Sequence, residues 1–256
     1  YQFANGGWMK NNPLQAQYSR YGIFDRLGDT SLDQIRTIVN EAASMDQTQG
    51  GIPQKITTLY QLGMDSVTLN AQGAEPIREE LARIAAIKND KELAAMIATL
   101  HREGIFPYFV TFVDADEKNS TMNIPALYQS GLGMGDRDYY LDPENESIRT
   151  AYKEYLGKIF RLSGVPEADI DKAVAGVLSI ETKLAEKNWS SVELRNIPAM
   201  YNPTKKADFE KAYDAIDWAE YYKTMGIGDF EQIIVTTPSA LANANELMKT
   251  PMPIVL

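Results

Sequence analysis

Apolar residues recur every three or four positions along most of this chain, a spacing that predicts amphipathic helices. The first such helix is expected from about residue 31 to 45, because Asp29-Thr30-Ser31 and Gln34 match a capping box. Its apolar face would hold Leu32, Ile35, Ile38, Val39 and Ala42. Comparable patterns predict helices over Pro53 to Gly73, Glu75 to Ile87, Asp90 to Arg102, Asp142 to Gly164, Pro166 to Lys187, Thr204 to Ile216, Trp218 to Met225 and Pro238 to Met248.

Two segments break this helical period. Phe106 to Val113 is rich in β-branched and aromatic residues, and Asn119 to Leu127 follows it after a polar turn, which predicts a β-hairpin. We interpret the acidic turn as solvated and not as a calcium loop, because the EF-hand spacing and its central glycine are absent. Phe230 to Val235 is expected to be a short strand or an extended link.

No internal repeat, low-complexity segment or long linker divides the chain. We therefore predict one mainly α, multi-helix domain with a small β-hairpin over residues 1–256. Aromatic residues gather near Tyr213, Trp218 and Tyr221, where helical spacing favours a packed core over a ligand platform.

Composition limits the partners of this segment. The chain carries 25 Lys and Arg against 35 Asp and Glu, a net charge of −10, without a basic cluster. This charge balance disfavours nucleic acid and anionic membranes as partners, because both are bound through clustered cations, and we predict neither for this segment. No apolar run reaches the roughly 18 residues of a membrane helix, and no signal peptide is visible. The lack of cysteine excludes disulfides and cysteine-type zinc sites.

The opening stretch, Tyr1 to Gly28, is too irregular for an ordinary amphipathic helix. Asn5-Gly6-Gly7 predicts a turn, and Phe3 and Trp8 on either side of it are expected to anchor the segment to the body of the domain. Pro13 bars a regular helix across the residues around it.

Arg20 lies in this stretch among Tyr18, Tyr21 and Phe24 and allows two interpretations. In the first, the guanidinium stacks on these rings or pairs with Asp25 or Asp29. In the second, it presents a planar fork to a carboxylate or phosphate of a ligand.

Other polar residues carry weaker signals. The glycines of Gly131 to Gly135 lack the βαβ setting of a phosphate cradle, so we expect them to let the backbone pass close to its neighbours. Arg137 and Asp138 are expected to form an ion pair, and Glu181 to lie on a solvated helix face. His101 is the single histidine, and a surface or packing role on its helix is favoured.

Three blocks of the sequence resemble one protein family. Asn5-Gly-Gly-Trp8 and Ser19-Arg-Tyr-Gly-Ile-Phe-Asp-Arg-Leu27 are similar to the start of the extracytoplasmic part of the neprilysin and endothelin-converting-enzyme family of zinc metallopeptidases. Gly131 to Tyr140 resembles a second family region, and Ile180 to Ala185 more weakly a third. Because the blocks keep the family's order and approximate spacing, the resemblance covers essentially the whole chain.

The resemblance implies a role within a larger protein. Family chemistry depends on a His-Glu-x-x-His helix with a third zinc ligand downstream, and one histidine cannot form that site. We therefore expect this chain to be the amino-terminal helical lobe of a two-lobed peptidase, with no catalytic residue, metal or cofactor of its own and with zinc in the parent protein. Its partners would be peptide substrates and the catalytic zinc domain of the same polypeptide.

The family pattern also assigns a residue and a location. It implies that Arg20 binds substrate near a free carboxylate, while a second family arginine is replaced here by Gly28, for which Arg26 is a partial substitute. Family members act outside the cytoplasm, and the absence of cysteine favours a bacterial member. The apolar ending, Pro251 to Leu256, is expected to continue into a larger fold, and removal of that partner would favour self-association.

Two alternatives come from other classes of function. The chain could be a stand-alone helical binding or scaffold protein in which Arg20 is structural. An independent hydrolase would need a nucleophile and base, and His101 as the single histidine makes this the weakest hypothesis.

Overall fold

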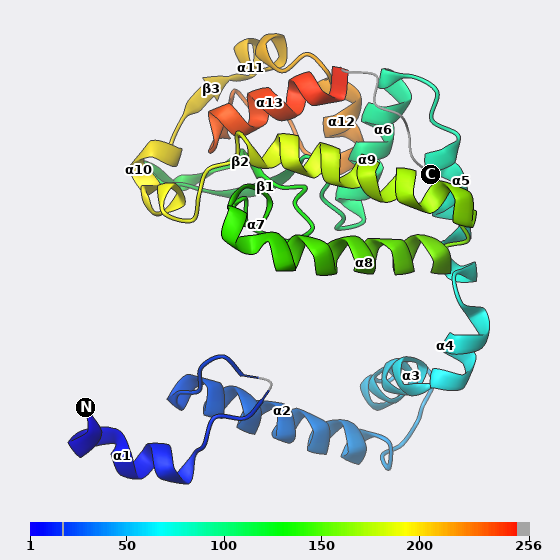
Figure 1. Cartoon of the computed structure of the whole chain (residues 1–256), viewed down its shortest axis with the longest axis vertical. Coiled ribbons are helices and arrows are strands. Elements are labelled where there is room, and N and C mark those ends of the chain that lie inside the picture. Colours follow the sequence, from blue (N-terminus) through cyan, green and yellow to red (C-terminus); the bar gives the residue numbers. More distant parts are fainter. Residues whose placement is uncertain (17, 250–256) are drawn as a thin grey trace. The chain divides into compact units, whose positions relative to one another are not determined.

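A computed structural model of the chain describes residues 1–16 and 18–249, and the predicted Pro251 to Leu256 ending lies outside them. The described residues form many helices and one small sheet, which confirms the mainly α fold with a β-hairpin (Figure 1). The chain folds into two compact units, Tyr1–Gly73 and the residues from Ala74 onward, where the sequence pattern suggests one domain. None of the described helices is long and apolar enough to cross a membrane.

Unit 1 consists of helices α1 (Gln2–Asn11), α2 (Ile23–Ala42), α3 (Ile52–Met64) and α4 (Ser66–Gln72). The prediction of a turn at Asn5 to Gly7 is wrong, because α1 runs through it and the Asn5 amide donates to Tyr1 O at 2.9 Å. Phe3 is not an anchor either, since its side chain is fully exposed.

Helix α2 begins well before the predicted start. The Asp25 carboxylate accepts a hydrogen bond from Gly22 N at 2.7 Å and caps the helix there. Asp29-Thr30-Ser31 therefore lies inside the helix, and its match to a capping box was misleading.

Unit 1 buries few of its apolar side chains. Among its described residues only Ala42 and Thr57 are buried. The long apolar side chains of α2 remain more than half exposed, including Ile23, Phe24, Leu27, Leu32, Ile35 and Ile38. The spacing of apolar residues every three or four positions thus identifies a face of α2 that the other described residues of unit 1 do not cover.

The sheet of unit 2 has the strand order β1-β2-β4-β3. Strands β1 (Phe109–Asp116) and β2 (Asn119–Gln129) form the predicted antiparallel hairpin. Strand β4 (Gln232–Val235) confirms the short strand expected there, but it pairs parallel to β2, with Ala126 opposite Ile234. Strand β3 (Pro203–Lys205) is antiparallel to β4 and has no counterpart among the predictions.

The helices of unit 2 follow the sequence pattern closely. They are η1 (Glu75–Ile77), α5 (Arg78–Ala85), α6 (Asp90–Arg102), α7 (Asp138–Leu141), η2 (Pro143–Asn145), α8 (Glu146–Leu162), α9 (Glu167–Ala185), η3 (Glu193–Arg195), α10 (Ile197–Met200), α11 (Lys206–Ala212), α12 (Trp218–Met225) and α13 (Pro238–Lys249). Helices α8 and α9 run alongside one another (Figure 1). Helices α6 and α12 match their predicted ranges to the residue.

The core of unit 2 is aromatic. Phe109 from β1 packs with Trp218 and Tyr221 from α12 and with Ile97 from α6, all of them buried. Phe209 from α11 is fully buried with its ring centroid 4.7 Å from that of Trp218. The predicted aromatic core is confirmed.

Candidate functional site

No metal site forms within residues 1–16 and 18–249, where no three His, Cys, Asp or Glu side chains gather closely enough to hold an ion. The described side chains of this chain therefore do not fit zinc.

His101 has a packing role. It is 3% exposed, with Nδ1 at 2.7 Å from the Tyr221 hydroxyl and Nε2 at 3.1 Å from Pro107 O. Because a carbonyl only accepts hydrogen bonds, Nε2 carries the proton and Nδ1 accepts from Tyr221. Burial lowers the pKa of His101 to about 4, so the imidazole is neutral at pH 7.

Arg20 lies beside a cavity of about 590 Å³ in unit 1, formed between α1 and the start of α2. Trp8 on α1 and Tyr21 belong to its lining and stack on one another, with their ring centroids 6.2 Å apart. The cavity combines these aromatic walls with the apolar Ile23 and the guanidinium of Arg20. It can accept a ligand that is apolar in part and carries one anionic group.

Both acids that were expected to pair with Arg20 bind elsewhere. Asp29 accepts hydrogen bonds from the hydroxyls of Tyr18 at 2.5 Å and Tyr21 at 2.6 Å. Asp25 is engaged at the start of α2. Among the residues that the structure describes, none makes a hydrogen bond, ion pair or ring contact to the exposed Arg20 side chain.

The two hydroxyls also fix the charge of Asp29. Their hydrogen bonds lower the pKa of Asp29, and the same bond raises the pKa of Tyr21 to about 12. Asp29 is therefore ionised and Tyr21 is neutral at pH 7, which keeps the Tyr18–Asp29–Tyr21 contact intact. The guanidinium of Arg20 remains available to a group outside the described residues.

Arg26 is poorly placed to replace the family arginine at position 28. Both positions lie within α2, and residues two apart on a helix point about 200° from one another. A Cβ at Gly28 would meet no atom within 4 Å, so an alanine fits there without a clash. The expected partial substitution by Arg26 is not supported by this geometry.

Glu181 does not lie on a solvated face, which corrects the sequence-based prediction. Its carboxylate accepts hydrogen bonds from Tyr140 Oη at 2.8 Å, Tyr152 Oη at 3.1 Å and Gly133 N at 3.2 Å. Burial raises the pKa of Glu181, although these hydrogen bonds oppose the shift. The sequence signal for this cluster was weak, because its members come from a loop and three different helices.

The glycine-rich loop allows close approach of the backbone, as predicted. A Cβ at Gly133 would lie 2.0 Å from the Tyr152 hydroxyl. Gly131 has a φ of 85° and a Cβ there would lie 2.7 Å from Tyr108 N. Packing around Glu181 and Tyr108 thus requires glycine at both positions.

Comparisons with known proteins match the chain along its whole length. The model of the family described as peptidase family M13 matches residues 1–255. Human endothelin-converting enzyme 1 is 29% identical over 98% of this chain, and Neprilysin-3 of Drosophila melanogaster is 24% identical over 97%. The chain spans only about a third of these relatives, 34% of each.

Solved structures agree with this match. The crystal structure of the Mycobacterium tuberculosis zinc metalloprotease Zmp1 in complex with an inhibitor superposes with a TM-score of 0.90 at 27% identity, over 99% of this chain and 39% of that one. PepO of Lactobacillus rhamnosis shares the fold with a TM-score of 0.80 at 20% identity, over 98% of this chain and 40% of that one.

Proposed function

Since the chain belongs to peptidase family M13, we propose that it is the amino-terminal, non-catalytic lobe of a zinc-dependent endopeptidase. In this proposal the lobe encloses the chamber in which the parent protein cleaves small peptides, and it restricts substrates by size. The observation that carries the proposal is the match of nearly the whole chain to 39% of a zinc metalloprotease. The remaining part of such a protein would supply the zinc ligands that the described residues lack.

The exposed apolar face of α2 supports a catalytic domain as partner. Side chains such as Phe24, Ile35 and Ile38 are more than half exposed and recur at helical spacing. An apolar surface of this kind is typical of an interface, because covering it removes apolar area from water. We place the zinc domain of the same polypeptide on this face.

Arg20 is the proposed substrate-binding residue. Its unpaired guanidinium, beside a cavity with aromatic walls, can donate two parallel hydrogen bonds to the terminal carboxylate of a peptide. Arg20 would orient the substrate and take no part in bond cleavage. We further propose, from the family resemblance, that the parent protein acts outside the cytoplasm.

Hydrolysis of a short peptide with a free carboxyl terminus, measured with the full-length protein, tests these roles. We expect Arg20→Ala to lower kcat/KM for the free acid by about 10- to 150-fold, the loss of one charged hydrogen-bonding group, and to leave the amidated peptide unaffected. Arg36→Ala is the matched control, because Arg36 is an exposed arginine of α2 that pairs with Asp33 at 3.5 Å. Equal losses for the two peptides would contradict a carboxylate-binding role.

A further inference from the structure

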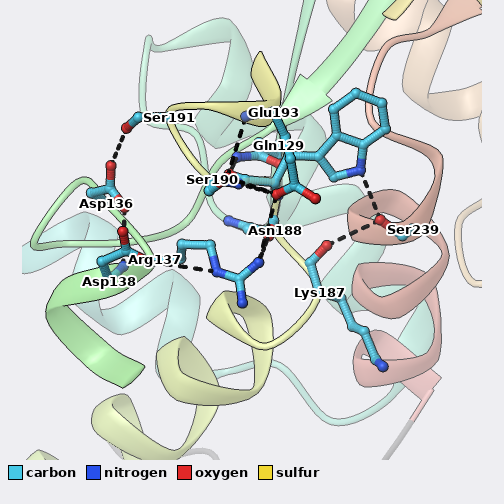
Figure 2. A network of polar contacts seen from close by, with 11 residues as sticks. Gln129, Asp136, Arg137, Asp138, Lys187, Asn188, Ser190, Ser191, Glu193 and Ser239 are labelled. Carbon is cyan, nitrogen blue, oxygen red and sulfur yellow. Dashed lines mark hydrogen bonds and ion pairs between the residues drawn. The ribbon is translucent and has the colours of Figure 1, made fainter. Parts of the chain in front are cut away.

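A second polar cavity, of about 300 Å³, lies in unit 2 and involves none of the residues proposed above to bind substrate. The end of β2, the loop before α7 and the segment after α9 form its walls (Figure 2). Its polar lining includes Gln129, Asp136, Arg137, Asn188 and Ser191.

Hydrogen bonds hold two sides of this cavity in place. Gln129 Oε1 accepts from Trp189 N at 2.7 Å, and Gln129 Nε2 donates to Trp189 O at 2.9 Å. Asp136 accepts from Asp138 N at 3.0 Å and from the Ser191 hydroxyl (Figure 2). These bonds fix the shape of the cavity before any ligand enters.

Two lining side chains keep hydrogen-bonding capacity that the described residues do not use. Asn188 is 3% exposed, and its side-chain amide has no hydrogen-bond partner among them. Arg137 donates from Nη1 to Asn188 O at 2.8 Å, but its Nε is buried without a partner. The carboxylates of Asp138 and Glu193 lie 3.9 Å from the guanidinium, too far for hydrogen bonds. The predicted Arg137–Asp138 ion pair is therefore present but long.

Charge restricts what this cavity can bind. Its lining carries one cation, Arg137, and one anion, Asp136. Hydrogen bonds from Asp138 N and Ser191 lower the pKa of Asp136, which keeps it ionised. A simple anion such as phosphate would meet Asp136 and the nearby Asp138 and Glu193, which repel it. A zwitterion matches both charges at once.

We propose that the cavity between Arg137 and Asn188 binds a free amino acid or a dipeptide. Arg137 and the Asn188 amide donate hydrogen bonds to the carboxylate, and Asp136 accepts from the ammonium group. The volume lies at the lower limit of small-molecule sites and suits a ligand of this size. Peptide hydrolysis releases such molecules, so the site would bind product, and this last link rests on the proposed function.

Calorimetric titration of the full-length protein with L-alanyl-L-alanine tests the proposal. We expect saturable binding that falls at least 10-fold in Asn188→Asp, which replaces the amide donor by a repelling carboxylate of the same shape. Arg137→Lys keeps the positive charge but lacks the planar guanidinium that can donate two parallel hydrogen bonds, so it should weaken binding similarly. Arg161→Lys, which alters an exposed ion pair with Glu167, is the matched control. Thermal unfolding without ligand establishes that each variant is folded.

Chemical variants of the probe separate the two ends of the ligand. N-acetyl-alanine lacks the ammonium group and alaninamide lacks the carboxylate, so each should bind at least 10-fold more weakly than alanine. If acetylated alanine and phosphate both bind as tightly as alanine, the cavity is an anion site, and the proposal of a zwitterionic ligand is overturned. Binding that persists in both Asn188→Asp and Arg137→Lys, or no saturation at roughly 10 mM, would overturn the site itself. Because hydrolysis is not measured, failure here leaves the proposed function standing.

Discussion

The two units of this chain share the helical spacing of apolar residues, but they differ in whether the resulting apolar faces are covered. In unit 2 the apolar faces of α6 and α12 meet the sheet and close a core around Phe109 and Tyr221. In unit 1 the apolar face of α2 stays exposed, and only Ala42 and Thr57 are buried among its described residues. An amphipathic pattern thus identifies a helix reliably, but it does not say whether the unit that contains the helix supplies the covering surface.

Truncation of one phenylalanine in each unit tests this difference most strongly. Phe209→Ala removes a fully buried ring from the core of unit 2 and should lower the free energy of unfolding by about 3–5 kcal/mol. Phe24→Ala removes a ring that is 84% exposed and should change it by less than about 0.5 kcal/mol. Urea titrations of the two variants give both values, and similar losses would mean that α2 is covered within this chain.

The histidine contribution to the pH dependence of stability should originate in unit 2, since unit 1 contains no histidine. The pKa of His101 falls from 6.5 to about 4 on folding, so the unfolded chain binds the proton more tightly. Stability is full above pH 6.5 and declines as the pH falls toward 4, by a total of about 3 kcal/mol.

Urea titrations across that pH range, repeated with His101→Gln, isolate this contribution. The variant should lose the part of the dependence that His101 contributes, whatever its overall stability, and keep the part that arises from carboxylates with lowered pKa values such as Asp136. Glu181 cannot imitate the effect, because its raised pKa makes stability fall as the pH rises. An unchanged pH profile in the variant would assign the dependence to other groups.

Two glycines, one in each unit, should respond to alanine with opposite signs. Gly133→Ala in unit 2 places a Cβ 2.0 Å from the Tyr152 hydroxyl, and the overpacking should cost about 1–3 kcal/mol. Gly28→Ala in α2 meets no atom within 4 Å and should stabilise the helix by about 0.5–1 kcal/mol. Thermal unfolding followed by circular dichroism compares them, and destabilisation by Gly28→Ala would show that something contacts α2 there.

The smallest change in stability is expected on the open face of α2 itself. The double variant Ile35→Glu, Ile38→Glu should alter the free energy of unfolding of this chain by less than about 0.5 kcal/mol per site, because both side chains are more than half exposed. It should, however, reduce self-association of the isolated chain in sedimentation velocity experiments. Unchanged self-association would mean that a surface other than this face of α2 mediates it.

Local signals were enough for most elements of the fold. Asn89 accepts from Glu92 N and caps α6, and Asp217 accepts from Glu220 N and caps α12, so these helices start where the sequence indicates. Pairing between strands that are far apart in the sequence has no such local signal. Strand β3 has three residues and is held by β4 alone, and nothing within its own sequence predicts that contact.

The candidate sites show the same limit. The motif around Arg20 drew attention to that residue, but the sequence allowed Asp25 or Asp29 as its partner as well as a ligand. Only the folded arrangement shows that tyrosine hydroxyls occupy Asp29. Glu181 and Asn188 depend on contacts between separate helices and loops. The sequence predicted a solvated helix face for Glu181 and gave no role to Asn188.

The parallel pairing of β2 with β4 bears on how the protein is made. The contact between Leu127 O and Thr236 joins residues 109 positions apart, so the sheet cannot be completed until the chain has been translated beyond Thr236. At about 5–20 residues per second, the hairpin waits on the order of 5–20 s for its partner strand. During that interval the backbone N–H and C=O groups along this edge of β2 are unpaired, and they are accessible to a chaperone at the ribosome.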